Sequence, residues 1–327
     1  MTVPAPPGSP LQALDRVLAS VEALRNGRAL FVLLATFAAA GLLLALAESA
    51  LVREQNVAGA IEAGLALFVA FYGGNAAGLL SMDQARGVAL REVAEAVRDA
   101  LLGAHRLLAV LGLAVAAVLA VGAVLWLLLW ASRADVLGPR AGAVLFGLTV
   151  PVAVVAVGLL LLTVTMVVAP LAAPAVWSGM GVRATLRLLA LQVRRRLVFV
   201  ALLSTAATLL TGAVAGLAAA VVVGGGRVVA LLAVLVTGIE IPPQQLMAGL
   251  FGYGLRSLGA AGAPVAQSAH GAAALVGGGL VFALALAVPA LVYLRALCAV
   301  LLALHPEAPA EPAEARWMLA DNRRPWT

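Results

Sequence analysis

Long apolar runs separated by short polar segments make up most of the chain. A helix needs about 20 mostly apolar residues to cross roughly 30 Å of hydrocarbon. Six runs meet this requirement, and they lie at residues 29–52, 57–80, 107–131, 141–169, 197–223 and 272–303. The pattern therefore predicts an all-α fold: a polytopic membrane bundle of six transmembrane helices in a single membrane domain (residues 1–303), followed by a tail at 304–327.

A further stretch, between the fifth and sixth runs, meets the requirement less cleanly. Residues 228–255 are interrupted by Glu240 and by the pair Pro242-Pro243, and proline ends or kinks a helix. We expect residues 224–270 to form an insertion at the outer face that re-enters the membrane or lies on its surface. A seventh span over 228–255 stays open as an alternative.

Amphipathic helical patterns precede the predicted hairpins. Residues 10–28, 87–106 and 179–196 each place apolar side chains on one helical face and charged side chains on the other. In the second segment, the spacing of Arg91, Glu95 and Arg98 predicts ion pairs along the exposed face. We predict three repeats of an amphipathic helix plus a helical hairpin, at residues 10–83, 84–175 and 179–303.

Arginines on two of these segments mark the face that we expect at the membrane surface. Arg183, Arg187 and Arg194 project within about 40° of one another on a helix. The expected interface residues are Arg91, Arg98, Arg183, Arg187, Arg194, Arg195 and Arg196. In such helices the apolar face enters the headgroup–acyl boundary while arginines meet the phosphates of anionic lipids. Anchoring, docking of a protein partner at the cytoplasmic face or tail, and regulation all stay open as their purpose.

The composition also indicates a membrane protein, and the distribution of charge predicts its orientation in the membrane. Only 11% of the 327 residues are charged and 64% are hydrophobic, whereas soluble domains carry about 25% charged residues. The formal net charge is +6, and every basic residue is arginine. With both termini cytoplasmic, fifteen arginines fall in inner segments and five in outer ones. The positive-inside rule therefore favours six spans with both ends in the cytoplasm.

Residues 169–202 carry a local motif that resembles one found in known membrane proteins. The matching positions are Pro170, Pro174, Gly179, Gly181, Ala184, Leu186, Arg187 and Arg194 to Arg196. The stretch is similar to a motif in the membrane domain attached to some glycerophosphodiester phosphodiesterases, and in related six-span bacterial proteins. Trp177-Ser178 stands where that motif has an acidic residue. The resemblance implies a six-span protein of the bacterial cytoplasmic (inner) membrane. We expect no catalytic phosphodiesterase domain, because no soluble segment of the sequence is long enough to hold one.

Residue types that carry catalytic chemistry are few and scattered. His105, His270 and His305 lie far apart, and Cys298 is the single cysteine. The absence of lysine excludes a GxxxxGK[ST] phosphate-binding loop. We expect no enzyme activity, no cofactor and no metal site, with an intramembrane enzyme as a weak alternative. Nucleic-acid binding is not expected either, because the arginines are divided among membrane-edge segments rather than gathered on a soluble domain.

Polar residues inside or beside the spans are the remaining functional candidates, because such residues are costly in hydrocarbon. They are Glu48, Glu62, Asn75 and Glu240. One interpretation is a polar path of a small-solute or lipid permease that runs between the repeats. The favoured interpretation is interfacial carboxylates plus one interhelical hydrogen bond from Asn75, in a non-enzymatic scaffold or accessory subunit that works through lipid and protein contacts.

Glycines within the spans predict close contacts between helices. They are Gly73, Gly74 and Gly78 in the second span, and Gly212 and Gly216 in the fifth, where TGAVAG forms a GxxxG pattern. Such small residues allow the backbones of membrane helices to approach closely.

Overall fold

The computed structural model describes residues 10–237 and 269–305. This part of the chain forms α1 (Pro10–Leu18), η1 (Ala19–Arg25), α2 (Gly27–Val52), α3 (Asn56–Arg86), α4 (Val93–Gly103), α5 (His105–Ala131), α6 (Ala134–Leu137), α7 (Pro139–Thr163), η2 (Val164–Val168), α8 (Ala169–Trp177), α9 (Val182–Thr237) and α12 (Ala269–Leu304), with no strand among them. Within these described ranges, six helices are long and apolar enough to cross a membrane. The predicted all-α fold with six spans is confirmed, and the chain has the architecture of an integral membrane protein.

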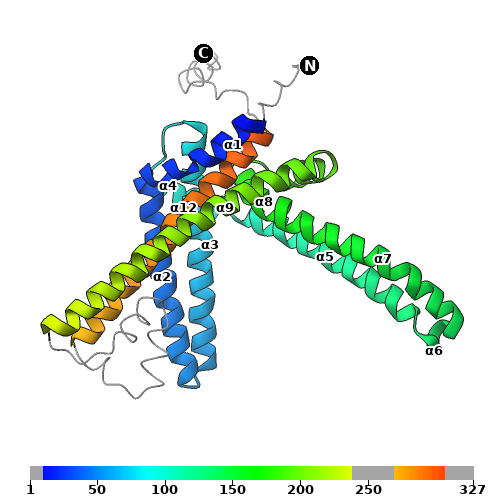
Figure 1. Cartoon of the computed structure of the whole chain (residues 1–327), viewed down its shortest axis with the longest axis horizontal. Coiled ribbons are helices and arrows are strands. Elements are labelled where there is room, and N and C mark those ends of the chain that lie inside the picture. Colours follow the sequence, from blue (N-terminus) through cyan, green and yellow to red (C-terminus); the bar gives the residue numbers. More distant parts are fainter. Residues whose placement is uncertain (1–9, 238–268, 306–327) are drawn as a thin grey trace, which may run out of the picture.

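Three helical hairpins diverge from a common region (Figure 1). In them α2 pairs with α3, α5 with α7, and α9 with α12. We call the common region the hub; it is formed by α1, η1, α4 and α8 and by the adjoining ends of α2, α3, α9 and α12. The α5–α7 hairpin reaches farthest from the other two (Figure 1).

The hydrophobic core lies in the hub rather than along the spans. Its largest fully buried side chains include Val17, Leu80, Leu171 and Leu291, which come from four different elements. In α12, 50% of the most apolar stretch is buried, against 6% to 11% in α3, α5, α7–α8 and α9. The hairpins therefore present most of their apolar side chains outward, where a bilayer or another protein covers them.

A π-helical turn lets the fourth span continue through two prolines. Pro170 has no N–H, so the carbonyl of Met166, four residues earlier, loses its α-helical donor. The π turn η2 lies directly before this point, and such turns accommodate local irregularities in a helix. The hydroxyl of Ser204 on α9 donates a hydrogen bond to that carbonyl at 3.0 Å. A backbone group that proline would leave unsatisfied thus joins two spans.

Several element boundaries differ from those that the pattern predicts. The segment 87–106 is not one helix, because α4 begins only at Val93 and α5 follows at His105. The fifth span does not end at Val223, since α9 continues to Thr237; the glycines at 224–226 are compatible with a helix, and apolar residues follow them. Residues 10–28 divide into α1 and the 3-10 helix η1.

The amphipathic segment before the fifth span is joined to that span in one long helix. Arg196 departs from helical geometry, with φ −141° and ψ 24°, and marks a kink in α9. Its position corresponds to the predicted junction between the interfacial helix and the span. The predicted path residue Glu240, the pair Pro242-Pro243 and tail residues 306–327 lie outside the described residues. Whether the three units are related repeats stays a prediction.

Candidate functional site

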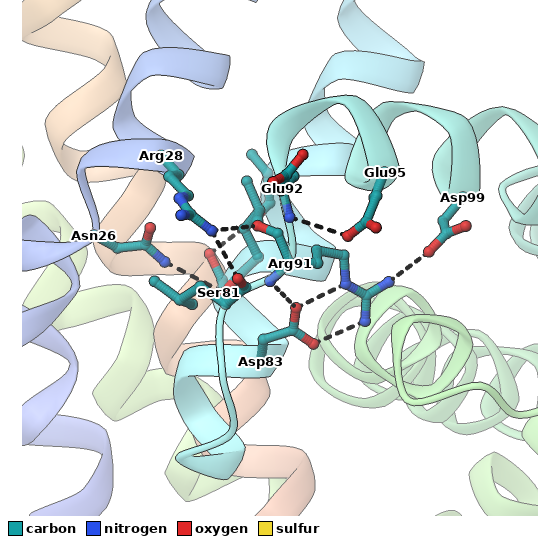
Figure 2. A network of polar contacts seen from close by, with 11 residues as sticks. Asn26, Arg28, Ser81, Asp83, Arg91, Glu92, Glu95 and Asp99 are labelled. Carbon is teal, nitrogen blue, oxygen red and sulfur yellow. Dashed lines mark hydrogen bonds and ion pairs between the residues drawn. The ribbon is translucent and has the colours of Figure 1, made fainter. Parts of the chain in front are cut away.

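An ion-pair network at the end of α3 is the most polar feature of the hub (Figure 2). Asp83 is 4% exposed, and its two carboxylate oxygens accept hydrogen bonds from Arg91 Nε at 2.7 Å and Nη2 at 2.8 Å. Nη1 of the same guanidinium donates to Asp99 on α4 at 2.9 Å. The hydrogen bonds that Arg91 donates to Asp83 raise the pKa of Arg91 above its ordinary value, and the charge of Asp99 acts in the same direction.

A tight reversal of the chain brings the members of this network together. Gly87, with φ 68°, ends α3 in the left-handed conformation that glycine adopts without strain. Its N–H donates to the carbonyls of Asp83 and Gln84, so the chain turns back over the last helical turn. Arg91, eight residues after Asp83, then reaches its carboxylate from an extended segment.

The same extended segment is tied to the start of α2. Nη1 of Arg28 donates to the carbonyls of Leu90 at 2.7 Å and Arg91 at 3.0 Å. Asn26 caps α2 by accepting the N–H of Ala29 at 3.1 Å, as expected for an N-cap residue. The Asn26 amide also donates to the carbonyl of Leu80 at 3.3 Å, so the first two spans are joined at the hub (Figure 2).

The ion pairs predicted along segment 87–106 do not form as expected. Glu95 instead accepts the N–H of Glu92 at 3.2 Å, and the two glutamates form a capping box at the start of α4. Arg91 precedes the helix, so the helical spacing that would place it beside Glu95 does not apply. Its guanidinium is bound to Asp83 and Asp99, which makes Arg91 a structural residue of the hub in addition to an expected interface residue.

A second polar contact joins α3 to α8. Asn75 is 5% exposed; its amide donates to the carbonyl of Phe71 at 2.8 Å, and its oxygen accepts the indole N–H of Trp177 at 2.9 Å. The indole ring lies directly against Gly78, where a Cβ would clash with it. The structure thus places at Asn75 the single interhelical hydrogen bond that the favoured interpretation expects.

A cavity of about 360 Å³ opens beside these contacts, between α3, α4, the start of α5 and the end of α8. We call it the hub pocket. Its lining residues are Asn75, Leu79, Arg86, Arg91, Asp99, Ala100, Leu102, Gly103, Ala104, Arg106, Val176, Trp177, Ser178 and Gly179. Small-molecule sites have volumes of roughly 300–1,000 Å³ and combine apolar walls with a few polar groups. The hub pocket has this character, because its lining combines three arginines and an aspartate with apolar residues.

The other expected interface arginines all lie at the hub and are exposed. They are Arg98 on α4 and Arg183, Arg187, Arg194, Arg195 and Arg196 on α9. The opposite face of that part of α9 is buried through Thr185, Leu189 and Gln192. The arginine face is therefore turned away from the protein, where it is available to lipid phosphates or a partner.

The predicted polar path is divided between two ends of the α2–α3 hairpin. Glu48 and Glu62 lie toward the end of the hairpin that is far from the hub, and both are partly buried. Asn75 is thirteen residues after Glu62 on α3, which is about 20 Å at the rise of an α-helix. The hub pocket reaches Asn75, and neither glutamate lines it.

The glycine contacts are only partly as expected. A Cβ at Gly73 would clash with Thr36 of α2, as one at Gly78 would with Trp177, so these two glycines allow close packing of α3. No described atom lies within 4 Å of the Cβ position at Gly74, Gly212 or Gly216. The expected GxxxG contact on α9 is therefore corrected: within the part of the chain that the structure describes, that face is open, because α9 and α12 pair through another side.

Sequence reasoning missed the residues that organise the hub. Asp83, Asp99, Arg86 and Arg106 were not singled out, and Trp177 was noted only as a departure from a motif. One signal was present: Asp83 follows a long apolar run, and a carboxylate at that place needs a partner. Its partner could not be chosen from the sequence, because Arg86, Arg91 and Arg98 all lie within reach along the chain.

Comparison with protein-family models, with curated proteins and with solved structures finds no significant match to this chain. The resemblance of residues 169–202 to the membrane domain of glycerophosphodiester phosphodiesterases stays a prediction.

Proposed function

We propose that the protein is a non-enzymatic scaffold or accessory subunit of the bacterial cytoplasmic membrane, acting through contacts with anionic lipids and with other proteins. In this proposal both termini and the hub face the cytoplasm. The placement of exposed arginines at the hub supports that orientation, since the far ends of the described hairpins carry only Arg53, Arg133, Arg140 and Arg227.

The divergence of the hairpins is the observation that carries the proposal (Figure 1). The α5–α7 hairpin packs on itself and on the hub, and its apolar side chains are exposed around most of its circumference; Leu119 and Val154, for example, are 66% and 67% exposed. A solid bundle would bury more of these side chains against its own helices. Separate hairpins leave room for transmembrane helices of a partner to pack between them.

The use of polar groups in the hub supports a non-enzymatic role. Asp83 and Arg91 hold a turn, Asn26 caps a helix, and Asn75 and Trp177 join two spans. These groups satisfy one another, as structural polar networks do. A catalytic acid, base or nucleophile needs an unoccupied side of the group that faces a substrate.

Crosslinking in native membranes tests the proposal. A photoreactive residue at Leu119 or Val154 should give a discrete protein adduct, whereas the same residue at buried Leu80 should not. The adduct should copurify in stoichiometric amount in mild detergent. Solute transport by the isolated chain in liposomes, without a partner, would refute the scaffold proposal.

One observation favours the permease as the second candidate function. The hub pocket reaches Asn75 inside the second span, and Glu62 carries a buried carboxylate oxygen with no hydrogen-bond partner among the described residues. Since about 20 Å of helix α3 separates the two, a permease would need a path along α3 that opens in another state. Flux in liposomes that is lost in Asn75→Leu and Glu62→Gln variants would support this candidate.

A further inference from the structure

The hub pocket combines positively charged and apolar lining residues near the ends of two membrane spans. Arg86 is the last residue of α3 and Arg106 the second residue of α5; both helices are membrane spans. The two guanidinium groups therefore stand at the depth where a span meets the headgroup region. Leu79, Val176 and the Trp177 indole line the pocket on the span side.

The three arginines of the pocket differ in the partners that the structure gives them. Arg91 is bound to both Asp83 and Asp99. Arg86 is positioned at the wall by a hydrogen bond from Nη2 to the carbonyl of Ser178 at 3.1 Å. Arg106 is exposed, and no ion pair joins it to a carboxylate in the described ranges. Arg86, Arg91, Arg106 and Asp99 line the pocket, and Asp83, which is bound to Arg91, brings the net charge of this cluster to +1, a sign that favours an anion.

Two of the residues that line the pocket, Gly103 and Gly179, have no side chain. A Cβ at Gly103 would meet no described atom within 4 Å. Gly179, with φ 92°, ends the turn after α8. Its conformation is one that other residues rarely adopt. A side chain at Gly103 would enter open space, and the backbone conformation at Gly179 favours glycine over residues that would add a side chain to the lining.

We propose that the hub pocket binds a monoanionic phosphate ester, with Arg86 and Arg106 on the phosphate oxygens and an apolar substituent of the ester over Leu79, Val176 and Trp177. Guanidinium groups bind phosphate oxygens through strong, charge-assisted hydrogen bonds. Asp99 lies at the Arg91 side of the pocket, so its charge directs the anion toward Arg106. Two sources share this chemistry: the headgroup of a phospholipid such as phosphatidylglycerol, and a soluble phosphate ester.

This inference rests on the proposed function only in assuming that lipid contacts matter to the protein. It differs in assigning one saturable site to the pocket, whereas the exposed arginine face would attract anionic lipid diffusely. A matched pair of arginines separates the two. Arg106 lines the pocket, while Arg98 is exposed on α4 at the same hub and does not line it.

Calorimetric titration of the full chain in a neutral detergent tests the site. The probes are dihexanoyl-phosphatidylglycerol, dihexanoyl-phosphatidylcholine, dibutyl phosphate (a soluble monoanionic ester with apolar substituents) and inorganic phosphate. We expect saturable binding of the phosphatidylglycerol at one site, weakened about tenfold or more in Arg106→Gln and unchanged in Arg98→Gln. Gly103→Leu, which fills the pocket without changing its charge, should weaken binding to a similar degree. Thermal unfolding without ligand shows whether each variant is folded.

The relative affinities of the lipid and the soluble ester identify the source of the ligand. Much tighter binding of phosphatidylglycerol than of dibutyl phosphate identifies a lipid headgroup site. Comparable affinities identify a site for soluble phosphate esters. Binding that phosphatidylcholine reproduces, that never saturates, or that falls equally in Arg98→Gln and Arg106→Gln overturns the pocket assignment. The last of these results would leave the lipid contacts of the proposed function intact, and transport in liposomes would refute that function whatever the titration shows.

Discussion

Removal of the buried charge at Asp83 is the sharpest test of how the hub is held together. Asp83→Asn keeps the shape of the side chain and one oxygen acceptor but removes the negative charge. The Asp83 side chain is 5% exposed, and that of Arg91 is 26% exposed. The substitution therefore leaves a partly buried guanidinium without its main counter-charge.

The magnitude follows from burial and from the partner that remains. Breaking a fully buried ion pair costs about 3–5 kcal/mol. Arg91 is partly exposed and keeps Asp99 at 2.9 Å, so we expect a loss of about 2–3 kcal/mol in the free energy of unfolding for Asp83→Asn. The matched control is Asp99→Asn. Its side chain is 46% exposed, and exposed pairs contribute about 0.2–1 kcal/mol.

Reversible unfolding in mixed micelles, followed by circular dichroism as the fraction of denaturing detergent rises, measures these differences. The double variant Asp83→Asn with Arg91→Gln isolates the pair, with an expected coupling of about 2 kcal/mol. The reasoning is refuted if Asp83→Asn costs no more than Asp99→Asn, or if the coupling is below about 0.5 kcal/mol. The raised pKa of Arg91 adds no pH dependence in the working range, because its stabilisation is present below the ordinary arginine pKa and is lost only at higher pH.

Three further predictions concern the contacts between spans, each measured by the same unfolding assay. Gly78→Leu should cost about 1–3 kcal/mol because the new side chain clashes with the Trp177 indole, while Gly74→Leu, in open space, should change stability by less than about 0.5 kcal/mol; equal effects would contradict the packing. Trp177→Phe should cost about 1–3 kcal/mol, since the buried amide on α3 loses its indole donor, and a neutral result would show that this hydrogen bond contributes nothing. Ser204→Ala should cost about 1 kcal/mol by removing the hydrogen-bond donor to the Met166 carbonyl. In a Pro170→Ala background, where a backbone N–H can replace that donor, the same change should be close to neutral. An undiminished cost in that background would contradict the role given to Ser204.

Much of the architecture was readable from one sequence because hydrocarbon imposes a simple rule. Every backbone polar group in a bilayer must be satisfied within its own helix or barrel, so an apolar run of sufficient length specifies a span with little help from its neighbours. The six predicted runs accordingly coincide with the six apolar helices. The helix α9 extends past the predicted end of the fifth span to Thr237, because the three glycines at 224–226 do not break a helix that apolar residues continue.

The candidate site could not be read in the same way. Asp83, Arg91 and Asp99 are each eight residues from the next, which is too far for side-chain contact along one regular helix or strand. Arg91 reaches Asp83 only because the chain turns back at Gly87. Trp177 and Asn75 are 102 residues apart. Their contact depends on the way α8 crosses α3, where Gly78 leaves space for the indole.

The sequence by itself determined the class of the protein, its spans and the side on which its arginines gather, because these depend on local hydrophobicity and charge. The tertiary structure alone decided that the hairpins diverge, that Arg91 binds two aspartates, and that Arg86 and Arg106 share a pocket. The physical reason is that outward-facing apolar side chains fit lipid equally well in many arrangements of the hairpins. The few buried polar groups of the hub are costly to leave unsatisfied, so their contacts select one of these arrangements.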